Sequence, residues 1–153
     1  MEAIKLENRI MDALKTAMKA KDEAALRTLR AIKAAILVEK TAEGFSGEMT
    51  ETAEQKMLQK LAKQRRDSLE IFTQQGREDL AATEREELAI IEQFLPQQMT
   101  EAELEEAISR ILTETGASTP ADMGRVMGMA SKSLAGRADG KAISEIVKKM
   151  LAR

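Results

Sequence analysis

The sequence contains no cysteine, histidine, tryptophan or tyrosine, and only three phenylalanines. Without cysteine and histidine there is no thiol nucleophile, no imidazole for acid–base catalysis, and none of the usual ligands of zinc or iron–sulfur clusters. Carboxylates alone remain as ligands for a hard cation such as Mg²⁺. We predict no catalytic residue, no metal site and no cofactor.

Long apolar runs are also missing. No stretch approaches the roughly 18 apolar residues that a membrane span needs. The first residues, Met1-Glu2-Ala3-Ile4-Lys5, lack the apolar region of a secretory signal. We predict a cytoplasmic protein with no membrane partner.

The chain has 153 residues, of which 43% are hydrophobic. That content is enough for one good core or two small ones without metals or disulfides. With so few aromatic residues, the core must consist of leucine, isoleucine, valine, methionine and alanine, which is typical of packed helices. We predict an all-α protein.

Charge is distributed unevenly, although the net charge is only −2. Residues 77–106 contain ten acidic residues against two arginines, and residues 116–153 contain seven basic residues against three acidic ones. These counts give −8 and +4. No global positive field draws the chain to nucleic acid, so DNA binding is not expected.

The first 95 residues show four helical segments in two hairpins, predicted near residues 4–20, 22–39, 50–75 and 80–94. In the first segment Leu6, Ile10, Leu14 and Met18 follow one another at spacings of four. Gly76 is expected to end the third helix with a left-handed cap, and Pro96 to stop the fourth. The predicted domains are residues 1–95 and 96–153.

The second domain is predicted to contain three short helices. Thr100 and Glu103 form a capping box, and the helix that follows ends at Gly116. A second helix begins at Ser118-Thr119-Pro120, and a third begins after Gly140.

Two glycine patterns in this domain suggest recognition. Gly124 and Gly128 lie one helical turn apart and allow close packing of another backbone, either within the chain or from a partner. The turn Gly136-Arg137-Ala138-Asp139-Gly140 joins two helices, with Asp139 as the cap of the second. We also expect backbone N–H groups at that helix start to point outward, flanked by Arg137 and Lys141, as in a phosphate-sized anion site.

The basic segment from Lys56 to Arg66 invites a nucleic-acid interpretation. Helical spacing favours a salt-bridged exterior, because Asp67 and Glu70 can pair with Lys63 and Arg66. Arg65 falls on the apolar side of this helix, where a guanidinium needs a carboxylate. We predict an ion pair between Arg65 and Glu87.

Several stretches resemble the GatB/YqeY family along nearly the whole chain. They are Lys63-Gln64-Arg65-Arg66-Asp67-Ser68, Gly76-Arg77-Glu78-Asp79-Leu80, Phe94-Leu95-Pro96 and the segment from Asp122-Met123-Gly124 to Gly140. Residues 124–147 also resemble the C-terminal tail of the B subunit of the glutamine-dependent aspartyl/glutamyl-tRNA amidotransferase. The matching positions are Gly124, Gly128, Lys132, Gly136, Ala138 and Val147, whereas Asp139 stands where that tail usually has Asn and Gly140 where it usually has Pro.

The resemblance implies a helical fold and an RNA-associated role. The residues expected to contact RNA are Arg125, Lys132, Gly136, Arg137 and Lys141. The expected partner is tRNA or a complex that handles it, such as the tRNA amidotransferase or a synthetase complex. Binding would use backbone and shape contacts, because the chain has almost no aromatic side chains for base stacking.

Two other functions stay open. The chain could be an accessory part of a carbon–nitrogen ligase with glutamine as amido-nitrogen donor, because the sequence has no autonomous site for that chemistry. It could instead be a protein–protein adaptor, whose sign would be an exposed apolar patch at Met123, Met127 and Met129.

Overall fold

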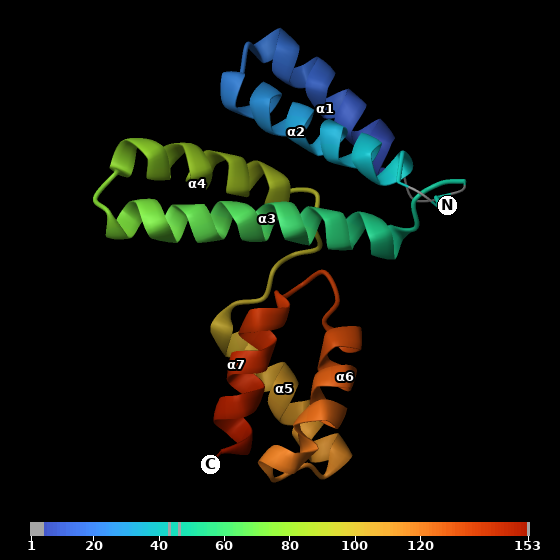
Figure 1. Ribbon diagram of the computed structural model, residues 1–153, viewed down its shortest axis with the longest axis vertical. Coiled ribbons are helices and arrows are strands. Elements are labelled where there is room, and N and C mark those ends of the chain that lie inside the picture. The colour runs from blue at the N-terminus through green and yellow to red at the C-terminus, as the bar shows by residue number, and fades with distance from the viewer. Residues whose placement is uncertain (1–4, 43, 46, 153) are drawn as a thin grey trace. The chain divides into compact units, whose positions relative to one another are not determined.

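The computed structural model describes residues 5–42, 44–45 and 47–152. The regular elements in this part of the chain are all helical, which confirms the all-α class. The elements are α1 (Leu6–Ala20), α2 (Glu23–Lys40), α3 (Glu51–Gln74), α4 (Glu78–Glu92), α5 (Glu101–Thr115), the 3₁₀ turn η1 (Pro120–Asp122), α6 (Met123–Ser133) and α7 (Gly140–Leu151). The chain divides into two compact units, Met1–Leu95 and Pro96–Arg153 (Figure 1). Each unit has its own hydrophobic core.

The first unit consists of two helical hairpins. Helices α1 and α2 lie side by side, α3 and α4 form the second pair, and α2 packs against both members of that pair (Figure 1). Sharp reversals separate the paired helices, with Lys21 at φ 54° after α1 and Gly76 at φ 70° after α3. Glycine takes such a left-handed conformation without the steric penalty of a Cβ, as predicted for Gly76. The buried core residues are Leu6, Ile10, Leu14, Ala17, Leu26, Leu29, Ile32, Ile36, Met57, Leu58, Ala62, Ile91 and Leu95.

One expectation for α1 is wrong. Met18 is 61% exposed, and Ala17 is buried in its place. Each step of four residues advances about 40° beyond a full helical turn, so by Met18 the stripe has rotated away from the face that buries Leu6.

The predicted ion pair between Arg65 and Glu87 is confirmed. The Arg65 Nη2 and Glu87 Oε1 atoms are 3.7 Å apart, and both side chains are mostly buried. Arg27 of α2 also approaches the same Oε1 atom, with its Nε atom at 3.8 Å. One carboxylate on α4 therefore holds cations from both α2 and α3, which satisfies the need of a buried charge for a partner.

The second unit packs α5, α6 and α7 around a smaller core. Its buried residues are Leu104, Ile108, Ile111, Val126, Ala130, Leu134, Ile143, Ile146, Val147 and Leu151. The Thr100 hydroxyl accepts from the Glu103 amide at 3.2 Å, and Gly116 ends α5 at φ 70°. The helix expected after Pro120 is present, but it starts as the 3₁₀ turn η1 before α6 becomes regular.

Candidate nucleic-acid interface

Helix α6 turns one face to the core and the other to solvent. Val126 and Ala130 are fully buried, whereas Gly124, Arg125, Gly128 and Lys132 are exposed. Arg125 and Lys132 are seven residues apart, so they lie on the same side of the helix and about 10 Å apart along its axis. The exposed side of α6 therefore combines two glycines with two cations, and we call these four residues the α6 face.

The two glycines do not pack against any described residue of the second unit. A Cβ atom added to Gly124 or Gly128 would meet nothing within 4 Å. Within the second unit Gly124 and Gly128 therefore make no close packing contact, and the approach of a partner backbone stays a prediction. The physical reason is the register of α6, which points Val126 and Ala130 inward and leaves the glycines on the solvent side.

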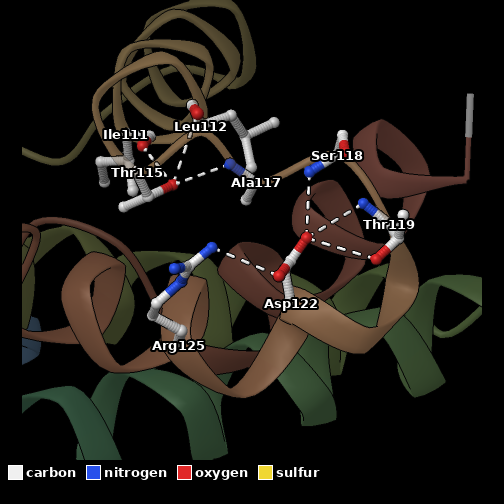
Figure 2. Close-up of polar contacts among 8 residues, drawn as sticks. All are labelled: Ile111, Leu112, Thr115, Ala117, Ser118, Thr119, Asp122 and Arg125. Atoms are coloured by element: carbon white, nitrogen blue, oxygen red, sulfur yellow. Dashed lines mark hydrogen bonds and ion pairs between the residues drawn. The ribbon is translucent and has the colours of Figure 1, made fainter.

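Asp122 fixes the start of α6 (Figure 2). Its Oδ2 atom accepts hydrogen bonds from the amides of Ser118 and Thr119 at 3.0 and 3.2 Å, and from the Thr119 hydroxyl at 3.3 Å. Its Oδ1 atom holds the Arg125 Nη2 atom at 3.2 Å. The amide donors at Ser118 and Thr119, with smaller help from the Thr119 hydroxyl and Arg125, lower the pKa of Asp122 below its usual 3.8.

Gly136 and Arg137 hold the chain that leads into α5. The Gly136 carbonyl accepts from the Gln98 Nε2 atom at 2.7 Å, and the Arg137 carbonyl accepts from the Met99 amide at 2.9 Å. The Arg137 Nε atom donates to the Gln97 carbonyl at 3.3 Å. Gly136 adopts φ 80°, which favours glycine. Both residues thus have structural contacts, and the Arg137 side chain remains largely exposed.

The start of α7 does not offer the open anion site that the sequence suggested. The Asp139 Oδ1 atom accepts from the Lys141 amide at 2.7 Å and from the Ala142 amide at 3.4 Å. These are the N–H groups expected to point outward. Asp139 occupies them as the predicted helix cap, which satisfies the donors that a phosphate would need.

Lys132 and Lys141 are the least engaged of the predicted RNA contacts. Both side chains are exposed, and within the described residues neither forms an ion pair. Lys132 lies in the last turn of α6 and Lys141 in the first turn of α7, on either side of the turn that contains Arg137. Lys132 and Lys141 therefore flank the connection between α6 and α7, which contains Arg137. Arg125 lies at the other end of α6.

The methionine patch expected of an adaptor is not formed as a group of three. Met123 and Met127 are half-buried against the core of the second unit, whereas Met129 is exposed. Met129 adds one apolar side chain to the solvent side of α6.

Sequence reasoning missed two residues that shape this interface. Asp122 completes a capping box with Thr119, so the pattern Thr119-Pro120-Ala121-Asp122 was the available signal. Gln98 bonds across to Gly136, 38 residues further on, and no local pattern indicates such a contact.

Among the described residues we find no group of three or more potential metal ligands and no helix long and apolar enough to cross a membrane.

Two curated relatives are similar to the chain, and both are named "Altered inheritance of mitochondria protein 41, mitochondrial". The protein of Lachancea thermotolerans is 36% identical over 109 residues, which cover 70% of this chain and 58% of that protein. The protein of Pyrenophora tritici-repentis is 32% identical over 149 residues, which cover 94% of this chain and 79% of that protein. The chain thus spans little more than half of the first relative.

These names contradict the prediction of a cytoplasmic protein, because both relatives are described as mitochondrial. That prediction depended on the missing apolar signal. Mitochondrial transit peptides are amphipathic and rich in arginine rather than apolar, so the argument excluded only a secretory signal.

The model of the YqeY-like protein family matches residues 7–151, from the start of α1 to the end of α7. The matched region includes both units and the whole α6 face. The chain therefore belongs to the YqeY-like family.

Proposed function

We propose that the second unit binds tRNA, or a complex that handles tRNA, through the α6 face and the adjacent turn. The unit contacts the sugar–phosphate backbone and reads its shape without performing chemistry. The resemblance of residues 124–147 to the tail of the amidotransferase B subunit supports this choice of partner.

The observation that carries the proposal is the pair of exposed glycines in α6. Glycine destabilises a helix interior by about 1 kcal/mol relative to alanine. Within the described second unit neither Gly124 nor Gly128 gains a packing contact in return, because a Cβ atom at either position would meet nothing within 4 Å. A surface free of side chains lets an external backbone approach the helix closely, so contact with a partner accounts for the pattern better than internal packing does.

The cations around these glycines provide a modest electrostatic attraction. Three of them are exposed, namely Lys132, Arg137 and Lys141. Arg125 forms an ion pair with Asp122, which partly neutralises its charge. Each phosphate contact releases condensed counterions. It makes the slope of log affinity against log salt concentration more negative by about 0.7 to 0.9. With about three contacts, we expect a slope of roughly −2 to −3.

The test is a titration of fluorescently labelled bulk tRNA with the protein at several salt concentrations, followed by anisotropy, with duplex DNA in parallel. The double variant Lys132→Glu/Lys141→Glu removes two cations whose side chains make no ion pair in the described structure. Gly128→Leu changes no charge and covers the α6 face with a bulky side chain. We expect both variants to weaken tRNA binding at least tenfold, which corresponds to about 1.4 kcal/mol.

The matched control is Lys56→Glu/Lys60→Glu on α3, which changes the net charge equally on the other unit. We expect it to bind tRNA as the wild type does. Equal binding to tRNA and duplex DNA, or no binding at low salt, would reject the proposal. Loss of binding only in the α3 control would move the RNA site to the basic segment from Lys56 to Arg66.

A further inference from the structure

A groove of about 510 Å³ runs between α1 and α2 in the first unit. Its apolar wall includes Met11 from α1 and Ala34 and Leu37 from α2, and its polar wall includes Arg30 and Lys33. We call these five residues the α1–α2 groove. The two helices lie side by side (Figure 1), and both contribute residues to the lining of the groove.

The apolar side chains of the groove remain in water. Leu37 is 62% exposed and Met11 is 42% exposed, although both belong to helices whose other faces are well buried. Transfer of such side chains out of water is favourable. The groove therefore favours an occupant with apolar side chains of its own.

The charges of the groove indicate which charge its occupant carries. Lys40, at one end, pairs with Glu7, so these two charges cancel. In contrast, Arg30 and Lys33 form no ion pair with any described residue. Two exposed cations beside an apolar wall favour an occupant that brings carboxylates.

The spacing of the groove residues favours a helical occupant. Arg30 and Leu37 are seven residues apart on one side of α2, with Lys33 and Ala34 between them, so the wall extends over about two turns. A partner helix matches such a wall with apolar residues at spacings of three and four and with glutamates beside them. Met11 adds a flexible side chain that adjusts to different shapes. The chain has no tryptophan or tyrosine, the side chains that anchor proteins at lipid interfaces, which disfavours a membrane as the occupant.

We propose that the α1–α2 groove binds an acidic amphipathic helix of a partner protein. The apolar face of that helix packs on Met11, Ala34 and Leu37, and its carboxylates pair with Arg30 and Lys33. This site lies in the first unit, so it is independent of the RNA contact proposed for the second.

The probe is a labelled synthetic peptide of 18 residues, the length of α2, with leucine and alanine on one face and glutamate on the other. A counterpart carries lysine in place of every glutamate. Binding to the full chain is measured by anisotropy and located by amide chemical shifts in ¹H–¹⁵N spectra. We expect the acidic peptide to bind at concentrations below about 500 μM and to bind at least tenfold more tightly than the basic one. The largest shifts should fall on residues of α1 and α2.

Two variants test the groove itself. Leu37→Gln keeps a good helix former and removes the apolar contact, and Arg30→Glu/Lys33→Glu reverses the charges. We expect each to weaken binding of the acidic peptide about tenfold or more, and the double variant to reverse the preference between the peptides. The control Lys56→Glu/Lys60→Glu should bind as the wild type does.

Other results would overturn the proposal. They are the absence of binding at about 500 μM, equal affinity for both peptides, and shifts located away from α1 and α2. Self-association of the chain that Leu37→Gln abolishes, measured by sedimentation, would assign the groove to a second copy instead. Binding to phosphatidylglycerol vesicles that depends on Leu37, without peptide binding, would assign it to a lipid surface.

Discussion

The two units differ in the size of their hydrophobic cores and in the polar contacts that join their helices. The first unit buries a larger core and joins its hairpins through Glu87, which holds cations from two helices. The second unit has a smaller core, and side-chain caps at Thr100, Asp122 and Asp139 hold the starts of its helices. It also exposes two helical glycines that contribute nothing to its own packing. The comparison shows that the unit with the smaller core carries exposed glycines that its own packing does not explain.

The largest effect should come from cavities in the two cores. We consider Ile108→Ala in the second unit and Ile32→Ala in the first, each of which truncates a fully buried side chain. Each substitution should lower the free energy of unfolding by about 3 kcal/mol. The second unit has only 58 residues, for which total stability is roughly 3–9 kcal/mol. We expect Ile108→Ala to raise hydrogen exchange throughout α5–α7 while α1–α4 stay protected. An equal response of both units to Ile108→Ala would contradict separate cores.

The next effect concerns the carboxylate shared by Arg27 and Arg65. Glu87→Gln leaves two arginines near a neutral amide, one of them mostly buried, and should lower the free energy of unfolding by roughly 2 kcal/mol. The neighbouring Glu86→Gln is the matched control. Its pair with Arg27 is exposed, so we expect a change within about 0.5 kcal/mol. Urea denaturation of both variants measures the difference, and equal losses would show that burial does not distinguish the two carboxylates.

Gly128→Ala should stabilise the second unit and weaken the RNA contact that we propose for it. The added Cβ meets nothing within 4 Å, and alanine favours the helix by about 1 kcal/mol. We expect a higher unfolding temperature for α5–α7 together with tRNA binding several-fold weaker than in the wild type.

Ser109→Ala on α5 provides the control for that variant, because it also introduces a better helix former at an exposed site. It should leave tRNA binding unchanged. A stabilised Gly128→Ala protein that binds tRNA normally would remove the main support for the α6 face.

The smallest effect depends on pH. The pKa of Asp122 is lowered below 3.8 mainly by the amides of Ser118 and Thr119. A depressed folded-state pKa stabilises the unit above the unfolded pKa, and this contribution is lost as pH falls through the folded value. We expect the stability difference between the wild type and Asp122→Asn to be constant near neutral pH and to shrink below about pH 3.8. A carboxyl ¹³C titration that gave Asp122 a pKa at or above 3.8 would contradict the assigned hydrogen bonds.

Local patterns in the sequence predicted the helices and most of their buried faces. Leu6, Ile10 and Leu14 are buried as their spacing indicated, because a regular helix converts spacing directly into direction. The predicted burial of Met18 was wrong, because residues at a strict spacing of four move gradually around the helix. Arg65 and Glu87 were predictable, since a cation on an apolar face requires a nearby carboxylate.

The candidate interface was less predictable. The sequence identified the cations of the interface. It could not show which residues of the turn form hydrogen bonds with distant residues, such as Arg137 with Gln97 and Gly136 with Gln98. Whether Gly124 and Gly128 face the core or solvent depends on the register of α6, which is set by Val126 and Ala130. Spacing alone gives the angle between these residues and does not say which side faces the core.

The shared carboxylate of Glu87 also bears on how the first unit opens. Separation of α2 from α3 and α4 would leave Glu87 with one arginine instead of two, at a site from which water is largely excluded. Separation of the two hairpins from each other is thereby penalised more than the lost apolar contacts alone would require. A single side chain thus couples the two hairpins into one cooperative unit, so that the slowest-exchanging amides of α2, α3 and α4 should report a common opening event.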